Sequence, residues 1–167
     1  MKKALSKLSL GAALTLLMVA GGVQTVSAQQ PPVEPRGFGI EGTWDATVTL
    51  LNCTTGVPLF PPGQSLVSYA KGGTYIEEAS GIPPSMRYPG LGVWMHVRAR
   101  TYTLAFKIFQ FNADGTSNGK IVIVTDVEHK LDDTLTSSGS ARLFNAAGDL
   151  IASLCVNTTG TRFTGIQ

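Results

Sequence analysis

Short segments in which apolar and polar residues alternate recur along the chain from Gly42 to Phe163. These segments are rich in β-branched and aromatic residues, and clusters of Gly, Pro, Asn and Asp separate them. No stretch keeps an apolar period of 3.6 residues over several turns, which excludes long amphipathic helices. The pattern predicts an all-β domain with strands at residues 42–53, 66–71, 74–79, 91–98, 101–111, 120–129, 135–144 and 150–163.

The connections between these eight segments alternate in length. Short connections join antiparallel neighbours, so the pattern predicts an up-and-down meander. In such a meander the odd-numbered connections lie at one end of the sheet and the even-numbered ones at the other. The first, third and fifth connections are long, and the second, fourth and sixth are short. We therefore expect one elaborated end, which would form a mouth, and one tight end.

The first and last segments contain residues that fit each other as paired strands. The even positions of the first segment are apolar from Trp44 onward, so the two-residue period of a strand turns them inward. Antiparallel pairing then places Trp44 beside Arg162 inside and Cys53 near Cys155 outside, in one register to within a diagonal step. The sequence thus predicts an eight-stranded antiparallel up-and-down barrel, closed by its first and last strands.

The first 28 residues have the features of a bacterial export signal. Lysines precede an uncharged apolar run at residues 8–20, and a Val-Ser-Ala tripeptide ends at Ala28. The apolar run is too short to span a bilayer, so no transmembrane anchor is expected after cleavage. Residues 29–41 are rich in Pro and Gly and are interpreted as a flexible leader, which leaves 42–167 as the barrel domain. We expect a secreted or periplasmic protein.

Export changes the interpretation of charge and of the cysteines. The chain of 167 residues has 13 basic and 11 acidic residues, and loss of the three lysines of the signal leaves a net charge of −1. The remaining basic residues are scattered singly, which excludes a nucleic-acid partner. In an oxidising compartment, Cys53 and Cys155 favour a structural disulfide over two free thiols. With only two histidines, no metal site and no cofactor are expected.

The inward positions predict a lumen with walls of unequal size. The seventh and eighth segments present small residues there, whereas the fifth presents Tyr102, Leu104, Phe106 and Ile108. An eight-stranded barrel is just wide enough for side chains to fill it or for one small ligand. An empty void would be destabilising, so either the large side chains cross the lumen or a ligand occupies it. Both alternatives stay open.

Two other segments bear on chemistry inside the barrel. In the fourth segment Val93, Met95 and Val97 form the more apolar set, so we expect them inward, with Trp94, His96 and Arg98 outward. The opposite orientation would give the lumen a polar cluster that includes Tyr69 and Tyr102. Glu77 and Glu78 are adjacent and point to opposite faces, so they cannot act as a paired acid and base.

The chain resembles the calycins, the group that contains lipocalins and avidins. The resemblance rests on Gly42-Thr43-Trp44, which opens the first strand, and on Arg162 within Thr159-Gly160-Thr161-Arg162-Phe163. In lipocalins a G-x-W sequence opens the first strand, and a basic residue near the end of the barrel packs across that indole at the closed end. The resemblance implies that a small apolar molecule binds inside the barrel.

Three functional hypotheses follow. The first is an exported lipocalin-like barrel that binds a small apolar or amphipathic molecule through a mouth formed by loops 54–65 and 80–90. Its candidate ligand-binding residues are Phe60, Met86, Tyr88, Tyr69, Tyr102 and Phe106. The second is a structural or interaction module of the cell envelope, in which an exterior patch of Phe109, Phe111, Val122 and Val124 mediates homo-oligomer contacts. The third is a small-barrel isomerase of the allene oxide cyclase type, for which His96 or Tyr102 would be required.

Overall fold

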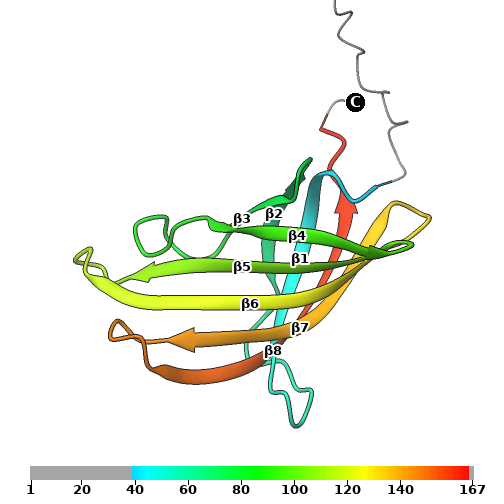
Figure 1. Ribbon diagram of the computed structural model, residues 1–167. Coiled ribbons are helices and arrows are strands. Elements are labelled where there is room, and N and C mark those ends of the chain that lie inside the picture. Colours follow the sequence, from blue (N-terminus) through cyan, green and yellow to red (C-terminus); the bar gives the residue numbers. More distant parts are fainter. Residues whose placement is uncertain (1–38, 166–167) are drawn as a thin grey trace, which may run out of the picture. The chain divides into compact units, whose positions relative to one another are not determined.

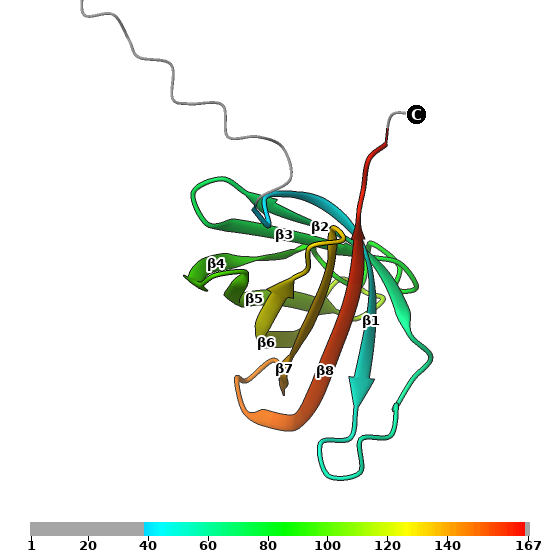
Figure 2. The same cartoon turned by 90° about the vertical axis from the view of Figure 1, so that its right-hand side faces the viewer.

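The computed structural model describes residues 39–165, and all eight of its elements are β-strands. Consecutive strands pair antiparallel, and the last strand pairs with the first to close a barrel (Figures 1 and 2). The predicted all-β, up-and-down barrel is therefore confirmed. The predicted signal segment and the leader before residue 39 lie outside the described residues. The strands are β1 (Gly42–Leu51), β2 (Gly63–Ala70), β3 (Thr74–Ala79), β4 (Gly90–Arg98), β5 (Thr101–Phe111), β6 (Ser117–His129), β7 (Thr134–Phe144) and β8 (Leu150–Arg162).

Two strands begin three residues earlier than the alternation predicts. Strand β2 begins at Gly63 because this residue still pairs with Val48 of β1. Strand β6 begins at Ser117, which pairs with Phe111 of β5 next to an irregularity in the register. Both added segments consist mainly of small polar residues and Gly, which carry no apolar alternation. Pairing with a neighbour, rather than local pattern, extends these strands.

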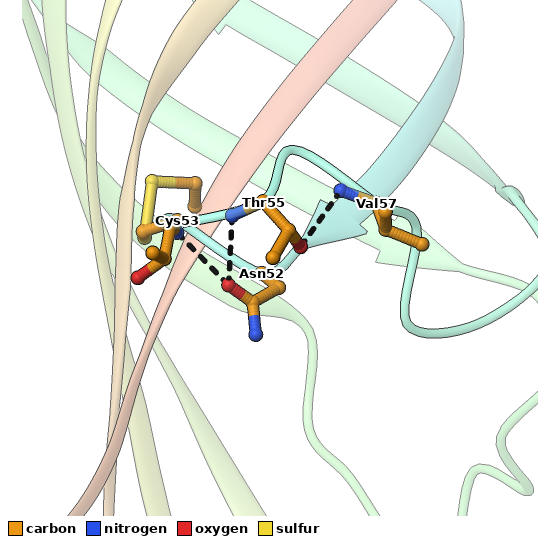
Figure 3. The surroundings of a disulfide bond; sticks show 6 residues. Asn52, Cys53, Thr55 and Val57 are labelled. Carbon is orange, nitrogen blue, oxygen red and sulfur yellow. Dashed lines mark hydrogen bonds between the residues drawn. A yellow bond between two sulfur atoms is a disulfide. The ribbon is translucent and has the colours of Figure 1, made fainter.

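The predicted register between the first and last strands is confirmed. Trp44 pairs with Arg162, and Leu51 pairs with Cys155. Cys53 lies two residues beyond Leu51 and forms a disulfide with Cys155, with the two Cα atoms 5.0 Å apart (Figure 3). The bond joins the loop after β1 to the middle of β8, and so covalently ties together the strands that close the barrel.

The two ends of the barrel differ as predicted. The turns at residues 71–73, 99–100 and 130–133 lie at one end, together with the start of β1 and the finish of β8. We call this the tight end. The opposite end, here the wide end, carries the longer connections at residues 52–62 and 80–89 and two hairpin loops.

Side chains fill the tight half of the barrel. Ile40, Trp44, Val127, His129 and Leu135 are all less than 2% exposed. Ile40 precedes the first strand, and its carbonyl oxygen accepts a hydrogen bond of 2.9 Å from the Trp44 indole N–H. The packed domain thus includes a residue of the segment interpreted from sequence as leader. For this half of the lumen, the alternative in which side chains cross the barrel is the one observed.

The predicted orientation of the fourth strand is wrong. Val93, Met95 and Val97 point outward and are 57–64% exposed, whereas Trp94 lies on the inner face and packs against the core. The reason is space: a Cβ atom at inward-facing Gly92 would collide with the backbone and Cβ of Phe106 on β5. The glycines of β4 give the Phe106 ring its room inside the barrel. Relative hydrophobicity of the two faces therefore did not decide which one is buried.

Candidate functional site

The tight end is closed by a cation packed over an indole. The Arg162 guanidinium lies 4.2 Å from the centre of the Trp44 ring. Its nitrogens donate to the carbonyl oxygens of Glu41 and Gly39 and, at 2.6 Å, to the Asp133 carboxylate. The hydrogen bond from Arg162 to Asp133, together with that from His129 and the charges of both groups, lowers the pKa of Asp133 below its usual value despite the opposing effect of partial burial. Trp44 and Arg162 thus have the contact expected of them, and they close this end to ligands.

His129 completes this closure from β6. Its side chain is fully buried, its ring meets the Trp44 ring edge-on at 5.3 Å, and its Nε2 lies 3.0 Å from an Asp133 oxygen. The other ring nitrogen, Nδ1, is buried without a hydrogen-bond partner among the described residues. Because Asp133 and Trp44 enclose the imidazole, it is a structural group of the tight end rather than part of an accessible site.

Aromatic rings cover the inner face of β2 to β5. Tyr69 meets Tyr75 at 5.0 Å and Trp94 at 6.1 Å, and Tyr75 continues the chain of contacts to Phe106 at 4.9 Å. Trp94 also meets Tyr102 edge-on at 5.7 Å. Three of the candidate residues, Tyr69, Tyr102 and Phe106, therefore belong to one aromatic layer inside the barrel. Such offset and edge-on contacts stabilise the wall beyond the burial of its area.

This layer is electrically neutral near pH 7. Burial raises the pKa of Tyr69 well above 10, and it raises that of Tyr75 together with the nearby Tyr69 and Glu77. Both phenols are therefore protonated and uncharged. His96, the other candidate of the isomerase hypothesis, is exposed at the tight end, where its Nε2 lies 2.9 Å from the Ala99 carbonyl oxygen.

A buried ion pair lies on the inner wall next to the aromatic layer. Arg87, from the loop before β4, reaches Glu77 of β3 with an Nη2–Oε2 distance of 2.5 Å, and the two side chains are 4% and 6% exposed. Ser65 of β2 donates to the same carboxylate at 3.0 Å. The Arg87 Nε is buried without a hydrogen-bond partner among residues 39–165. The Arg87 and Glu77 charges neutralise each other, and the Arg87 Nε–H lacks a hydrogen-bond acceptor among these residues.

Sequence reasoning missed this pair. The alternation along β3 correctly separates Glu77 from Glu78, but it cannot identify the partner of an inward carboxylate. Arg87 lies in a proline-rich loop and pairs through an isolated bridge from Arg87 to Gln110 of β5. That bridge aligns the loop with the barrel wall and turns the Arg87 side chain inward. The one available signal was an inward Glu in a wall that is otherwise aromatic, which requires a cation nearby.

The wide half of the lumen is lined by apolar side chains that remain partly open to solvent. Four buried residues, here called the floor, form one apolar cluster, and five half-buried residues, here called the rim, pack against it. The floor consists of Ile108, Ile123, Ala141 and Val156. This rim consists of Val48, Leu50, Phe106, Ile121 and Leu154. We call rim and floor together the wide-end cup. Phe106 belongs to the cup and also contacts the aromatic layer, so it connects the two.

The ion pair borders the wide-end cup. A Cβ atom added at Gly90 would lie 2.7 Å from a Glu77 carboxylate oxygen and 2.9 Å from the Phe106 ring. The Glu77 carboxylate and the Phe106 ring therefore both lie next to Gly90. The cup is apolar on the walls of β1, β6 and β8, and it has a compensated charge pair on the wall of β3. This arrangement suits a molecule with an apolar body and one polar group.

The three loop residues predicted for the mouth, Phe60, Met86 and Tyr88, are not part of the cup. Phe60 is 62% exposed, on a loop that projects beyond β1 and β2 (Figure 1). Met86 ends a turn closed by its backbone hydrogen bond to Pro83 and is half-buried, and Tyr88 is 60% exposed. Tyr88 packs on Phe111 with ring centres 4.9 Å apart. The lumen residues of the prediction thus come together, whereas Phe60 and Tyr88 are exposed and none of the three loop residues belongs to the cup.

The loop after β1 has an internal structure anchored by the disulfide. The Asn52 side-chain oxygen accepts hydrogen bonds from the backbone N–H groups of Thr54 and Thr55, and the Thr55 hydroxyl accepts one from Val57 (Figure 3). An Asn side chain that bonds to the following amides is a common way to fix a turn. The turn and the disulfide together hold the start of this loop beside β8.

Residues 39–165 contain neither a metal-ligand cluster nor a membrane-spanning helix, but they contain two open hollows outside the cup. No group of three or more His, Cys, Asp or Glu side chains in this part of the chain is placed to hold a metal ion. No helix of this part is long and apolar enough to cross a membrane. Two open hollows, lined mainly by charged and hydroxyl side chains, lie at the turn 128–132 and across β6 to β8, away from the cup.

Comparison with known proteins found no match to this chain. No protein-family model matches the chain, and no curated protein is similar to it.

Proposed function

We propose that this protein is an exported, lipocalin-like barrel that binds a small amphipathic molecule in its wide-end cup. The observation that carries the proposal is the half-buried apolar rim beside a buried Arg87–Glu77 pair. Apolar side chains that stay partly open to solvent inside a barrel favour an apolar ligand, and a few fixed polar groups orient it. The plugged tight end supports entry from the wide end.

The polar groups favour a ligand that is uncharged where it meets the wall. Because Glu77 neutralises Arg87, a ligand carboxylate would meet the repulsion of Glu77 as well as the attraction of Arg87. The Arg87 Nε–H has no acceptor among the described residues. Because that nitrogen is inaccessible to solvent, a neutral amphipathic molecule would meet the edge of the ion pair with its polar group and cover the rim with its hydrocarbon part. The export signal predicted from the sequence, together with the disulfide, supports a role outside the cytoplasm.

A fluorescence titration tests the proposal. The neutral probe N-phenyl-1-naphthylamine, which brightens in apolar surroundings, should bind the protein at one site. Leu154→Trp places a large side chain in the cup and should weaken binding about tenfold or more. Its matched control, Ser153→Trp, places the same side chain on the outer face of β8 and should leave affinity within about twofold, with thermal unfolding confirming that both variants fold.

Two results would contradict the proposal. One is the absence of probe binding to the folded protein. The other is equal binding by the Leu154→Trp and Ser153→Trp variants, since the site would then lie outside the cup. The Leu154→Ala variant is a second test in the same titration: it enlarges the cup, so it should still bind the probe.

A further inference from the structure

The outer surface of the barrel has two unlike sides. The outward residues of β7, β8 and β1 are mainly hydroxyl and amide side chains, among them Thr47, Thr136, Ser138, Ser140, Asn157 and Thr159. The outward residues of β4 are all apolar: Leu91, Val93, Met95 and Val97, each 57–64% exposed. This one-sided distribution marks the β4 side as a surface for contact, because scattered exposed apolar residues would not concentrate on one strand.

The neighbouring strands extend this apolar surface. Leu91 pairs with Ile76 of β3, which is 44% exposed. Val93 pairs with Ala105 of β5, and Ala105 pairs in turn with Val124 of β6. We call the outward residues of β4 with Ile76, Ala105 and Val124 the β4 face. Directly opposed residues in adjacent strands lie within contact distance, so the face is continuous.

Charges of opposite sign lie at the two ends of the β4 face. Lys107 pairs with Leu91 at the end nearer the wide end of the barrel. Asp126 and Glu128 lie on β6 at the other end, where they pair with Thr103 and Thr101 of β5. None of these three charged groups forms an ion pair within residues 39–165. On the β5 and β6 side of the face, the positive group therefore lies at the wide end and the two negative groups at the tight end, whereas Glu78 is exposed beside Ile76 on the β3 side.

We propose that the β4 face binds the same face of a second copy of this chain. The two-fold axis would cross the strands between Val93 and Met95, so that β4 runs antiparallel to its counterpart. Leu91 then lies opposite Val97 of the partner subunit, and Lys107 lies beside Glu128 of the partner subunit. A two-fold interface repeats each contact, so the dimer contains this ion pair twice. Apolar residues fill the centre, and charges form the rim, as in stable interfaces.

The other simple two-fold axis runs parallel to the strands and gives different contacts. A two-fold axis parallel to the strands would place β5 over β3 of the partner subunit. Lys107 would then lie directly over Ile76 of the partner subunit, and the nearest acidic group would be Glu78, one outward position further along that strand. The antiparallel arrangement keeps the apolar centre and also places each lysine near a carboxylate. The wide-end cup lies inside the barrel and stays open in this dimer, so the inference is independent of the proposed function.

The oligomeric state in solution tests the inference. Light scattering coupled to size-exclusion chromatography should give twice the mass of one chain. Val93→Lys puts a charge at the centre of the interface and should produce a monomer with the unfolding midpoint of a folded barrel. Ser140→Lys, the same change on the polar side of the barrel, should remain a dimer. At about 1 mM protein, only association weaker than a millimolar dissociation constant would escape detection. A wild-type protein that is still monomeric at this concentration overturns the proposal.

Charge reversal tests the antiparallel geometry itself. Lys107→Glu and Glu128→Lys each create like-charge contacts across the interface and should weaken dimerisation about tenfold or more, as measured by sedimentation equilibrium. The double variant exchanges the two charges and should restore the wild-type dissociation constant to within about threefold. A dimer that tolerates Val93→Lys, or a double variant no better than either single one, would show that the β4 face is not the interface proposed.

Discussion

Loss of Arg87 should destabilise the barrel strongly, although Arg87 lies in a loop. Its guanidinium and the Glu77 carboxylate are about 95% buried, and Arg87 supplies two of the three hydrogen bonds that reach this carboxylate. In the Arg87→Met variant, the carboxylate would keep only Ser65 as a partner. Removal of one member of a buried pair typically costs about 3–5 kcal/mol, whereas an exposed pair is worth about 0–1 kcal/mol.

The assay is urea unfolding at pH 7 with the disulfide intact, followed by tryptophan fluorescence. Arg142→Met is the matched control, because Arg142 is exposed on the outer face of β7, and it should change stability by less than about 0.5 kcal/mol. The double variant Glu77→Leu/Arg87→Met removes both charges and should recover most of the lost stability. A loss below about 1 kcal/mol for Arg87→Met alone would refute the buried, mutually dependent pair.

Three further predictions concern the closure of the barrel and its packing. Replacing Cys53 and Cys155 by serine should lower the free energy of unfolding by up to about 4–5 kcal/mol, because the bond closes a 102-residue separation; urea unfolding measures this, and an unchanged midpoint would count against it. The pKa of Asp133 is lowered in the folded state, so its contribution to stability is present above the unfolded pKa near 4 and is lost as the pH falls through the folded pKa. The stability of the Asp133→Asn variant should therefore depend less on pH below 5 than that of the wild type. Equal acid-unfolding profiles of the two proteins would contradict this. Gly92→Ala should lower the free energy of unfolding by about 1–3 kcal/mol in chemical denaturation, because the added Cβ has no room. Gly63→Ala, where no atom lies within 4 Å of the added Cβ, should leave stability nearly unchanged. Equal losses of stability in the two variants would refute the packing argument.

The fold could be predicted from sequence because its main signals are local and repeated. Alternation gives the strands, the turn residues give the connections, and the Trp44–Arg162 and Cys53–Cys155 pairs give the closing register. The two cysteines were informative because a disulfide requires close approach of two residues far apart in sequence. Pairing of polar segments, as at Gly63, leaves no such signal, and so the boundaries of β2 and β6 were misplaced.

The candidate site could be predicted only in part. Inward positions of β2 and β5 follow from period two, which correctly places Tyr69, Tyr102 and Phe106 inside. The orientation of β4 depends on the space that Gly92 leaves for Phe106, a contact between strands that one strand's pattern cannot reveal. Arg87 depends on the path of a loop. Neither the hydrophobicity of a strand nor the composition of a loop contains this information.

The position of a bound ligand tests the central claim most directly. Methyl NMR spectra recorded during titration with 1-octanol, a neutral amphipathic molecule, distinguish the inside of the barrel from its outside. We expect the methyl signals of Val48, Ile121 and Leu154 in the wide-end cup to shift with one saturating dissociation constant, while those of Leu91 and Val93 on the outer face do not. Shifts confined to the outer methyl groups, or none in the cup at saturating octanol, would contradict a ligand site inside the barrel.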